Sequence, residues 1–135
     1  MKPTPATSRR LAAVCLFAIL CLAAPARAGE ADVLQVEATQ SASGTWRFRV
    51  TVAHADEGWE HYADNWEVLD PDRRVLGARV LLHPHVDEQP FTRSLDGVVI
   101  PPEVTEVILR AHDSVHGHGG KEVVVTLAQI GRAHV

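Results

Sequence analysis

After residue 28 the chain contains no cysteine and no methionine, since Cys15, Cys21 and Met1 all lie within the first 28 residues. A disulfide and a sulfur-ligated metal site are therefore excluded for the rest of the chain. Any transition-metal site there must use imidazole nitrogen or carboxylate oxygen. A sustained helical period of apolar residues is also absent after residue 28, so the sequence favours an all-β domain.

Residues 1–28 have the organisation of a secretory signal peptide. Three basic side chains precede an apolar run over 11–24, and Ala26-Arg27-Ala28 fits the small-x-small rule for cleavage. The apolar run is short for a membrane-spanning helix, so a retained membrane anchor is the less favoured alternative. Neither cysteine follows a small residue, which argues against lipid modification. We expect cleavage after residue 28, a periplasmic or secreted product, and no membrane association afterwards.

Residues 29–129 have the length of one domain with a single modest core. Eight basic side chains stand against 17 acidic ones in this range, which gives a net charge of −9 with histidine neutral. Such a surface repels nucleic acid and favours cations or basic protein partners, so nucleic-acid binding is excluded.

Residues 130–135 do not continue the strand pattern and resemble the translation of a sequencing adapter. We expect a non-native or disordered tail there.

Alternating apolar and polar residues predict about seven short strands between turn signals. The clearest covers 45–53, where the apolar side chains from Trp46 to Val52 share one face. In segment 104–112, Val107 and two further apolar residues share a face in the same way. Further strands are expected over 33–39 with Leu34, Val36 and Ala38 inward, and over 66–69, 75–82, 91–95, 98–100 and 122–127, with a turn at Asp96-Gly97 between the two short segments.

Seven strands over about a hundred residues are typical of an immunoglobulin-like or fibronectin-III-like β-sandwich. A small barrel is the alternative. The lack of paired cysteines argues against an antibody-type domain, whereas Trp46 and Trp66 are suitable core tryptophans. We therefore predict an all-β sandwich.

Histidine is the most informative residue type in the predicted domain. Successive antiparallel strands alternate in direction, so the strands over 45–53, 75–82 and 104–112 all end at the same end of the sandwich. The loops at that end also contain several carboxylates, together with Trp59 and Tyr62. The seven histidines of the domain all fall there: His54, His61, His83, His85, His112, His116 and His118.

This convergence predicts a site for Cu(II) or Zn(II), because neutral imidazole is a preferred ligand of both ions. The expected ligands are His83, His85, His112 and His116, with His61 and His118 in reserve and with Asp87 and Asp113 orienting the rings. We expect His54, which closes an inward strand face, to be a hydrogen-bonded residue at the edge of the core. A polar network that joins the loops without an ion is the alternative.

Three stretches, His61–Trp66, Arg79–His85 and Arg110–His116, resemble a family of small, uncharacterised bacterial periplasmic proteins. The resemblance covers most of the predicted domain. It implies a secreted immunoglobulin-like or fibronectin-III-like protein and brings no activity with it.

Catalytic motifs are missing from the sequence. It has no Gly-x-Ser-x-Gly elbow, no His-Glu-x-x-His pattern and no phosphate-binding glycine loop. We therefore expect a non-enzymatic periplasmic protein that binds copper or zinc for buffering or delivery. The alternative is a protein- or glycan-interaction module in which Trp59, Tyr62 and the histidines form the recognition surface.

Overall fold

A computed structural model describes residues 29–128. The predicted signal peptide and the predicted tail lie outside the described residues. Within residues 29–128 there is no helix of the length and apolarity needed to cross a membrane. The same range contains seven strands joined by loops: β1 (Asp32–Gln40), β2 (Trp46–Ala53), β3 (Ala63–Leu69), β4 (Val75–Val80), β5 (Phe91–Val98), β6 (Glu106–Asp113) and β7 (Val123–Thr126).

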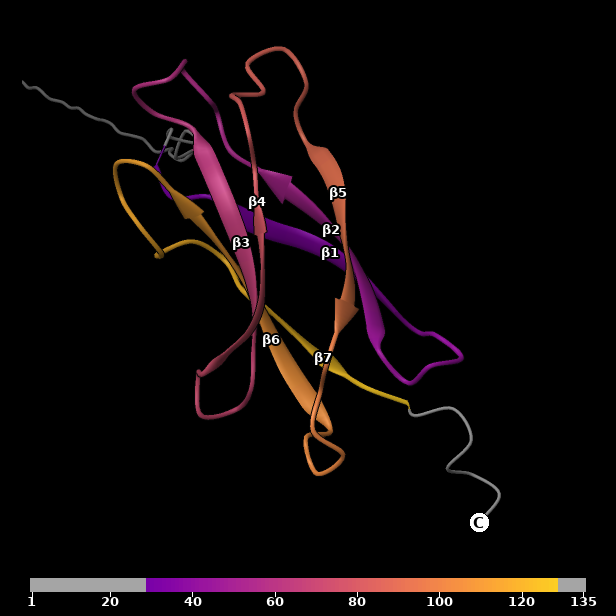
Figure 1. Cartoon of the computed structure of the whole chain (residues 1–135). Coiled ribbons are helices and arrows are strands. Elements are labelled where there is room, and N and C mark those ends of the chain that lie inside the picture. The colour runs from indigo at the N-terminus through magenta and orange to yellow at the C-terminus, as the bar shows by residue number, and fades with distance from the viewer. Residues whose placement is uncertain (1–28, 129–135) are drawn as a thin grey trace, which may run out of the picture.

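The strands form two antiparallel sheets that pack as a sandwich (Figure 1), which confirms the predicted fold class. One sheet has the order β1-β2-β5 and the other has the order β4-β3-β6-β7. In a constant-type immunoglobulin domain the fourth strand joins the sheet of the first, second and fifth strands. Here β4 pairs with β3 instead, so the topology departs from the immunoglobulin constant type.

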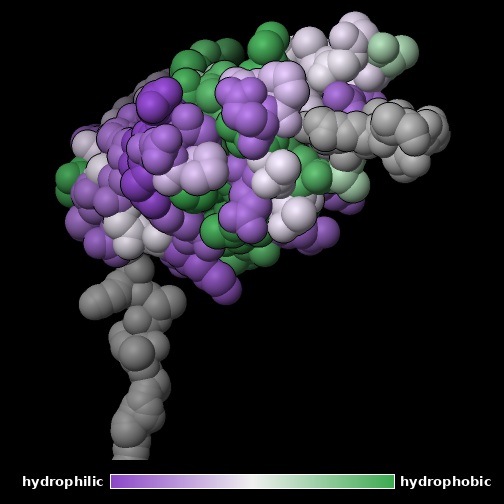
Figure 2. All heavy atoms as spheres, turned by 90° about the horizontal axis from the view of Figure 1, so that it is seen from below, coloured by the Kyte–Doolittle hydropathy of each residue, from purple (hydrophilic) through white to green (hydrophobic). Residues whose placement is uncertain are grey.

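The loops that follow β2, β4 and β6 lie in the upper half of Figure 1, and they contain all the histidines among residues 29–128 apart from His112, which lies near the end of β6. We call this the histidine end. Figure 2 looks at the opposite end, where hydrophilic residues are interrupted by hydrophobic patches. A pocket there lies between the turn over 70–74 and the segment over 101–106, and no histidine lines it.

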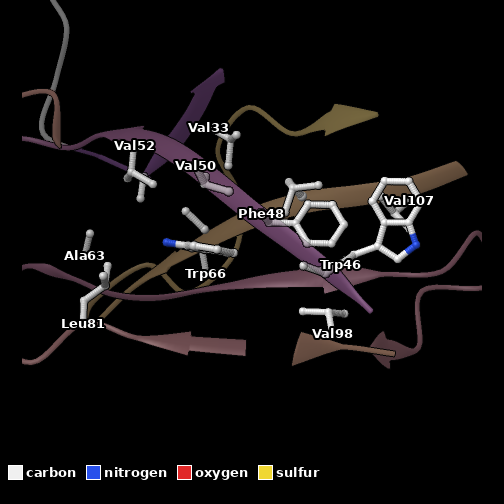
Figure 3. Packing of buried hydrophobic residues seen from close by; sticks show 14 of the residues in the cluster. Val33, Trp46, Phe48, Val50, Val52, Ala63, Trp66, Leu81, Val98 and Val107 are labelled. Atoms are coloured by element: carbon white, nitrogen blue, oxygen red, sulfur yellow. The ribbon is translucent and has the colours of Figure 1, made fainter. Parts of the chain in front are cut away.

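The hydrophobic core lies between the sheets, because each sheet turns one face of alternating apolar residues inward. Val52 and Ala63 lie at one end of this core and Trp46 at the other, as Figure 3 shows. The predicted inward faces of β2 and β6 and the two predicted core tryptophans are confirmed. The fully buried large hydrophobic side chains are Val33, Phe48, Val50, Val52, Trp66, Val68, Leu69, Phe91, Val107 and Leu109.

Two local predictions were wrong because the sheet contains β-bulges. The register of β1 shifts between Val33 and Gln35, which buries Val33 and leaves Leu34 46% exposed instead of inward. The expected turn at Asp96-Gly97 is also part of a continuous strand. Gly97 has φ +72° where β5 carries one extra residue opposite β2, a conformation that glycine adopts without strain.

The last loop approaches the start of β1 closely. A Cβ at Gly120 would lie 2.0 Å from the carbonyl oxygen of Ala31, so only glycine fits there. Asp32 accepts a hydrogen bond from the backbone nitrogen of Lys121 at 2.7 Å, and Val33 donates to the carbonyl of the same residue at 2.9 Å. These contacts fix residues 31–33 against the histidine end.

Gly120→Ala is expected to lower the free energy of unfolding by about 1–3 kcal/mol, because backbone must shift to admit the methyl group. Gly119→Ala is the matched control, since its new methyl group would meet only the side chain of Glu30, which can move. Urea unfolding of both variants measures the difference. Equal losses in the two variants would contradict the close approach at Gly120.

Candidate metal centre

The inward faces of two strands each end in a polar residue at the histidine end. On β2 the alternation continues past Val52 to His54, and on β6 it continues past Ala111 to Asp113. The side chains of His54 and Asp113 have 0% exposure. Ala63 at the start of β3 pairs with Asp113, and His61 precedes it by two residues. Two strands and the start of a third therefore deliver polar side chains to the end of the core marked by Val52 and Ala63.

Three ligand atoms converge at this point. Asp113 Oδ2 lies 3.0 Å from His54 Nε2 and 2.6 Å from His61 Nε2. The two Nε2 atoms lie 3.2 Å from each other. Tetrahedral coordination with bonds of about 2.0 Å places neighbouring ligand atoms about 3.3 Å apart. The three atoms therefore already have nearly the spacing that a small divalent ion requires. We call His54, His61 and Asp113 the buried triad.

Carboxylates hold the outward nitrogens of both rings. His54 Nδ1 lies 2.6 Å from Asp56 Oδ1, and His61 Nδ1 lies 2.9 Å from Glu57 Oε1. A carboxylate on the far nitrogen fixes the ring and raises its basicity as a ligand, as in many zinc sites. It also binds the proton of a neutral imidazole, which leaves the lone pair of each Nε2 directed at Asp113. Two lone pairs that face a carboxylate oxygen repel it. Either a second proton on each ring or a cation between the rings is needed to remove this repulsion.

His116 lies beside Asp113, one member of the buried triad, but it is not among the three residues whose ligand atoms all lie close to one another. Its Nδ1 lies 3.1 Å from Asp113 Oδ2, and its ring packs against that of His61 with the centroids 4.9 Å apart. Its backbone nitrogen donates to Asp113 Oδ1 at 2.6 Å, which fixes the loop on the carboxylate. The His116 side chain is 36% exposed, so it forms the solvent side of the site.

The electrostatics favour positive charge at this point. The hydrogen bond that His61 donates to Glu57 and its contact with Asp113 raise the pKa of His61 above 6.5, although burial opposes the shift. Burial acts to raise the pKa of Asp113, but hydrogen bonds from His116 and His61 hold it below 3.8. Asp113 is therefore an anion at neutral pH, surrounded by three imidazole rings.

Metal-free protein is expected to lose stability as the pH rises through the raised pKa of His61. Protonated His61 stabilises the fold fully below its unfolded pKa of 6.5, and this contribution disappears once the folded ring loses its proton. NMR titration of the His61 ring and urea unfolding at about pH 5.5 and about pH 8.5 measure both effects. Glu57→Gln should lower the pKa of His61 and flatten the pH dependence. An unchanged titration in that variant would contradict the assignment.

Two of the expected ligands, His83 and His85, are not part of the buried triad, although the backbone nitrogen of His85 donates to Asp56, the carboxylate that holds one ring of that triad. Their rings pack at 4.6 Å, and the ring of His85 stacks on Phe91 at 4.1 Å. Arg93 donates to His85 Nε2 at 2.9 Å and places a positive charge beside it. Burial, followed by Arg93 and His83, lowers the pKa of His85. This pair is therefore a poor place for a cation.

Expected ligands His112 and His118 form a third group. His112 precedes Asp113 on β6, so the two side chains point to opposite faces of the sheet. His112 Nδ1 lies 2.5 Å from Asp64 Oδ1, and the rings of His112 and His118 pack at 4.7 Å. His118 Nε2 is 3.5 Å from Glu67 Oε1. The structure thus brings together His61, His116 and Asp113 from the sequence-predicted set and leaves the other expected ligands, His83, His85, His112 and His118, outside the buried triad.

The remaining predicted residues lie on the loops around the site. Asp87 is exposed in the loop between β4 and β5. Trp59 is 66% exposed and packs edge-on against Tyr62, with ring centroids 5.6 Å apart.

Sequence reasoning gave His54 no ligand role and gave Asp113 only an orienting role. His54 is hydrogen-bonded at the edge of the core, as expected, but its Nε2 faces the shared point of the buried triad. The signal was present in the alternation, because both residues occupy the next inward position after a run of buried apolar residues. A polar residue at that position on two strands that end together indicates a buried polar site.

Comparisons with known proteins give one informative match. The chain is 43% identical over 98 residues to a protein named "Putative lipoprotein" from the archaeon Halomicrobium mukohataei. The match covers 71% of this chain and 47% of that protein, so the chain spans about half the length of the curated relative. No known protein-family model matches the chain. No solved structure matches it either. These findings are consistent with a small uncharacterised family.

Proposed function

We propose that this domain binds a divalent transition-metal ion, Cu(II) or Zn(II), through His54, His61 and Asp113, with His116 as a fourth ligand. The observation that carries the proposal is the convergence of His54 Nε2, His61 Nε2 and Asp113 Oδ2 within 3.2 Å of one another. The carboxylates on the far ring nitrogens support it, because they leave the lone pairs directed inward. The result is a ligand set of three nitrogens and one oxygen.

This ligand set fits buffering or delivery of the ion rather than turnover. Imidazole and carboxylate without sulfur suit Zn(II) and Cu(II), with copper favoured by the general affinity order. The side chains of the buried triad are at most 10% exposed, whereas catalytic zinc sites keep an open position for water or substrate. His116, on the exposed loop, provides the side from which an ion would enter and leave.

The proposed place of action is outside the cytoplasm, in the periplasm or the medium. The signal-peptide pattern of residues 1–28 supports this location, and so does the name of the archaeal relative, a lipoprotein. In that compartment the domain would bind metal ions from the medium before they enter the cytoplasm. Its net charge of −9 would concentrate cations near the site.

Thermal unfolding of the metal-stripped protein with Cu(II) or Zn(II) tests the proposal. Both ions are expected to raise the melting temperature in a saturable way, since an ion that binds only the folded state stabilises it by mass action. The shift should vanish below about pH 5, where protons compete for imidazole. Mg²⁺ is the control, because it prefers oxygen ligands. Equal shifts with Mg²⁺, or none with either transition metal, would refute metal binding.

A second candidate function is recognition of a protein or glycan at the histidine end. The observation in its favour is Trp59, which is 66% exposed on the loop beside the site. Leu82, Val86 and Val115 are exposed on the neighbouring loops. Exposed aromatic residues with apolar neighbours are common in binding surfaces. Trp59→Ala would abolish such binding and leave metal affinity unchanged, which separates the two functions.

A further inference from the structure

We propose that Gly29 becomes part of the metal site when the signal peptide is removed, and that its new α-amine and its carbonyl oxygen bind the ion together. The inference deepens the proposed function and rests on it. It adds a maturation step, because the protein would bind metal at full strength only after cleavage between residues 28 and 29.

Gly29 is already in contact with the buried triad. Its carbonyl oxygen lies 3.0 Å from His54 Nε2, the nitrogen that also faces Asp113 Oδ2 at 3.0 Å. The same Nε2 lies 3.2 Å from His61 Nε2. One backbone oxygen therefore reaches the nitrogen around which the side-chain ligands gather, and it adds an oxygen donor without any rearrangement of the loops.

The last loop fixes the chain that leads to Gly29. Ala31 fits against Gly120 so closely that no side chain is possible there, and Glu30 packs beside Gly119. The backbone of Lys121 donates to Asp32 and accepts from Val33. Because contacts at four successive residues, from Glu30 to Val33, join this segment to the last loop, the start of the domain is held in one place relative to the site. A ligand at Gly29 would be positioned before the ion arrives.

Cleavage changes the chemistry of the Gly29 nitrogen. In the precursor this nitrogen is part of a peptide bond, and its lone pair is delocalised into the carbonyl group of the preceding residue. After cleavage it is an amine with a pKa of about 7.7–8.0, whose neutral form has a free lone pair. The amine nitrogen and the carbonyl oxygen of one residue close a five-membered ring on a bound ion. Glycine has no side chain that would obstruct such a ring.

The cleavage motif lies immediately before this residue. Ala26-Arg27-Ala28 has the small residues that signal peptidase requires, and Gly29 follows this motif directly. The new amino terminus would therefore be generated at the metal site itself, with no intervening linker.

Selective acetylation of the α-amine tests the inference. The full chain is exported, purified after processing, and shown by mass spectrometry to begin at Gly29. A Lys121→Arg background removes the only lysine after residue 28, so that acetylation near neutral pH modifies the amino terminus alone. Cu(II) affinity is then measured by chelator competition for the free and acetylated forms. Cu(II) electron paramagnetic resonance reports the number of bound nitrogens.

The free form is expected to bind Cu(II) at least about tenfold more tightly than the acetylated form and to show one more bound nitrogen. Equal affinity and identical spectra would overturn the role of Gly29 and leave the proposed function standing. A processed chain that begins elsewhere, for example at Cys21, would also overturn it. Failure of both forms to bind Cu(II) would reject the proposed function together with this inference.

Discussion

Asp113→Asn is expected to weaken Zn(II) and Cu(II) binding by at least about a hundredfold, because loss of mere orienting partners in metal sites already weakens binding about 10–100-fold. Asp113 Oδ2 contacts the rings of His54, His61 and His116 within 3.1 Å. Asparagine keeps the shape of the side chain but removes its negative charge, the only charge in the proposed set of side-chain ligands. Competition with a chromogenic chelator measures the affinity.

Asp64→Asn is the matched control. Asp64 contacts His112 at 2.5 Å, on the other face of the sheet from Asp113. It therefore tests whether a nearby acid–histidine pair outside the buried triad contributes to binding. The affinity should remain within about threefold of wild type, the usual effect of a surface substitution. An equal loss in the two variants would place the ion elsewhere or spread it over the whole histidine end.

Asp56→Ala is expected to destabilise the domain by about 3–5 kcal/mol, the usual effect of leaving a buried polar group without its partner. Asp56 is fully buried and accepts three hydrogen bonds: from His54 Nδ1 at 2.6 Å, from the backbone of Ala63 at 3.0 Å and from the backbone of His85 at 2.7 Å. One carboxylate thus joins the end of β2, the start of β3 and the loop after β4. Its removal leaves three buried donors unsatisfied.

Thermal and urea unfolding of the metal-free protein measure this effect. A loss of that size should lower the melting temperature by at least about 10 °C in a domain of about 100 residues. Asp72→Ala is the control, because its side chain is 77% exposed at the opposite end of the sandwich. A change below about 1 kcal/mol in Asp56→Ala would show that solvent or neighbouring groups replace its hydrogen bonds.

The strands could be predicted from the sequence because alternation is a local property. Trp46 to Val52 reads as a half-buried strand without any knowledge of its partners, and the structure buries those side chains. The bulges at Leu34 and Gly97 could not be predicted in the same way. A bulge depends on the register against the neighbouring strand, which is set by contacts between distant residues.

The end of the sandwich that contains the site was predictable, but its ligands were not. Strand direction alone placed the histidines at one end. Which side chain points inward changes with a shift of one residue in the strand register. His112 and Asp113 are neighbours, and His112 lies on the outer face whereas Asp113 lies in the core. His83 and His85 were expected to be ligands, yet their loop turns His85 onto Phe91 and Arg93.

Isothermal titration of two double variants with Cu(II) and Zn(II) is the most direct test of the proposed site. His54→Ala/His61→Ala removes two members of the buried triad, whereas His83→Ala/His112→Ala removes two histidines that lie outside it. We expect the first pair to abolish stoichiometric binding and the second pair to retain it. Circular dichroism shows whether each variant is folded. Binding that survives the first pair and disappears in the second would contradict the proposed site.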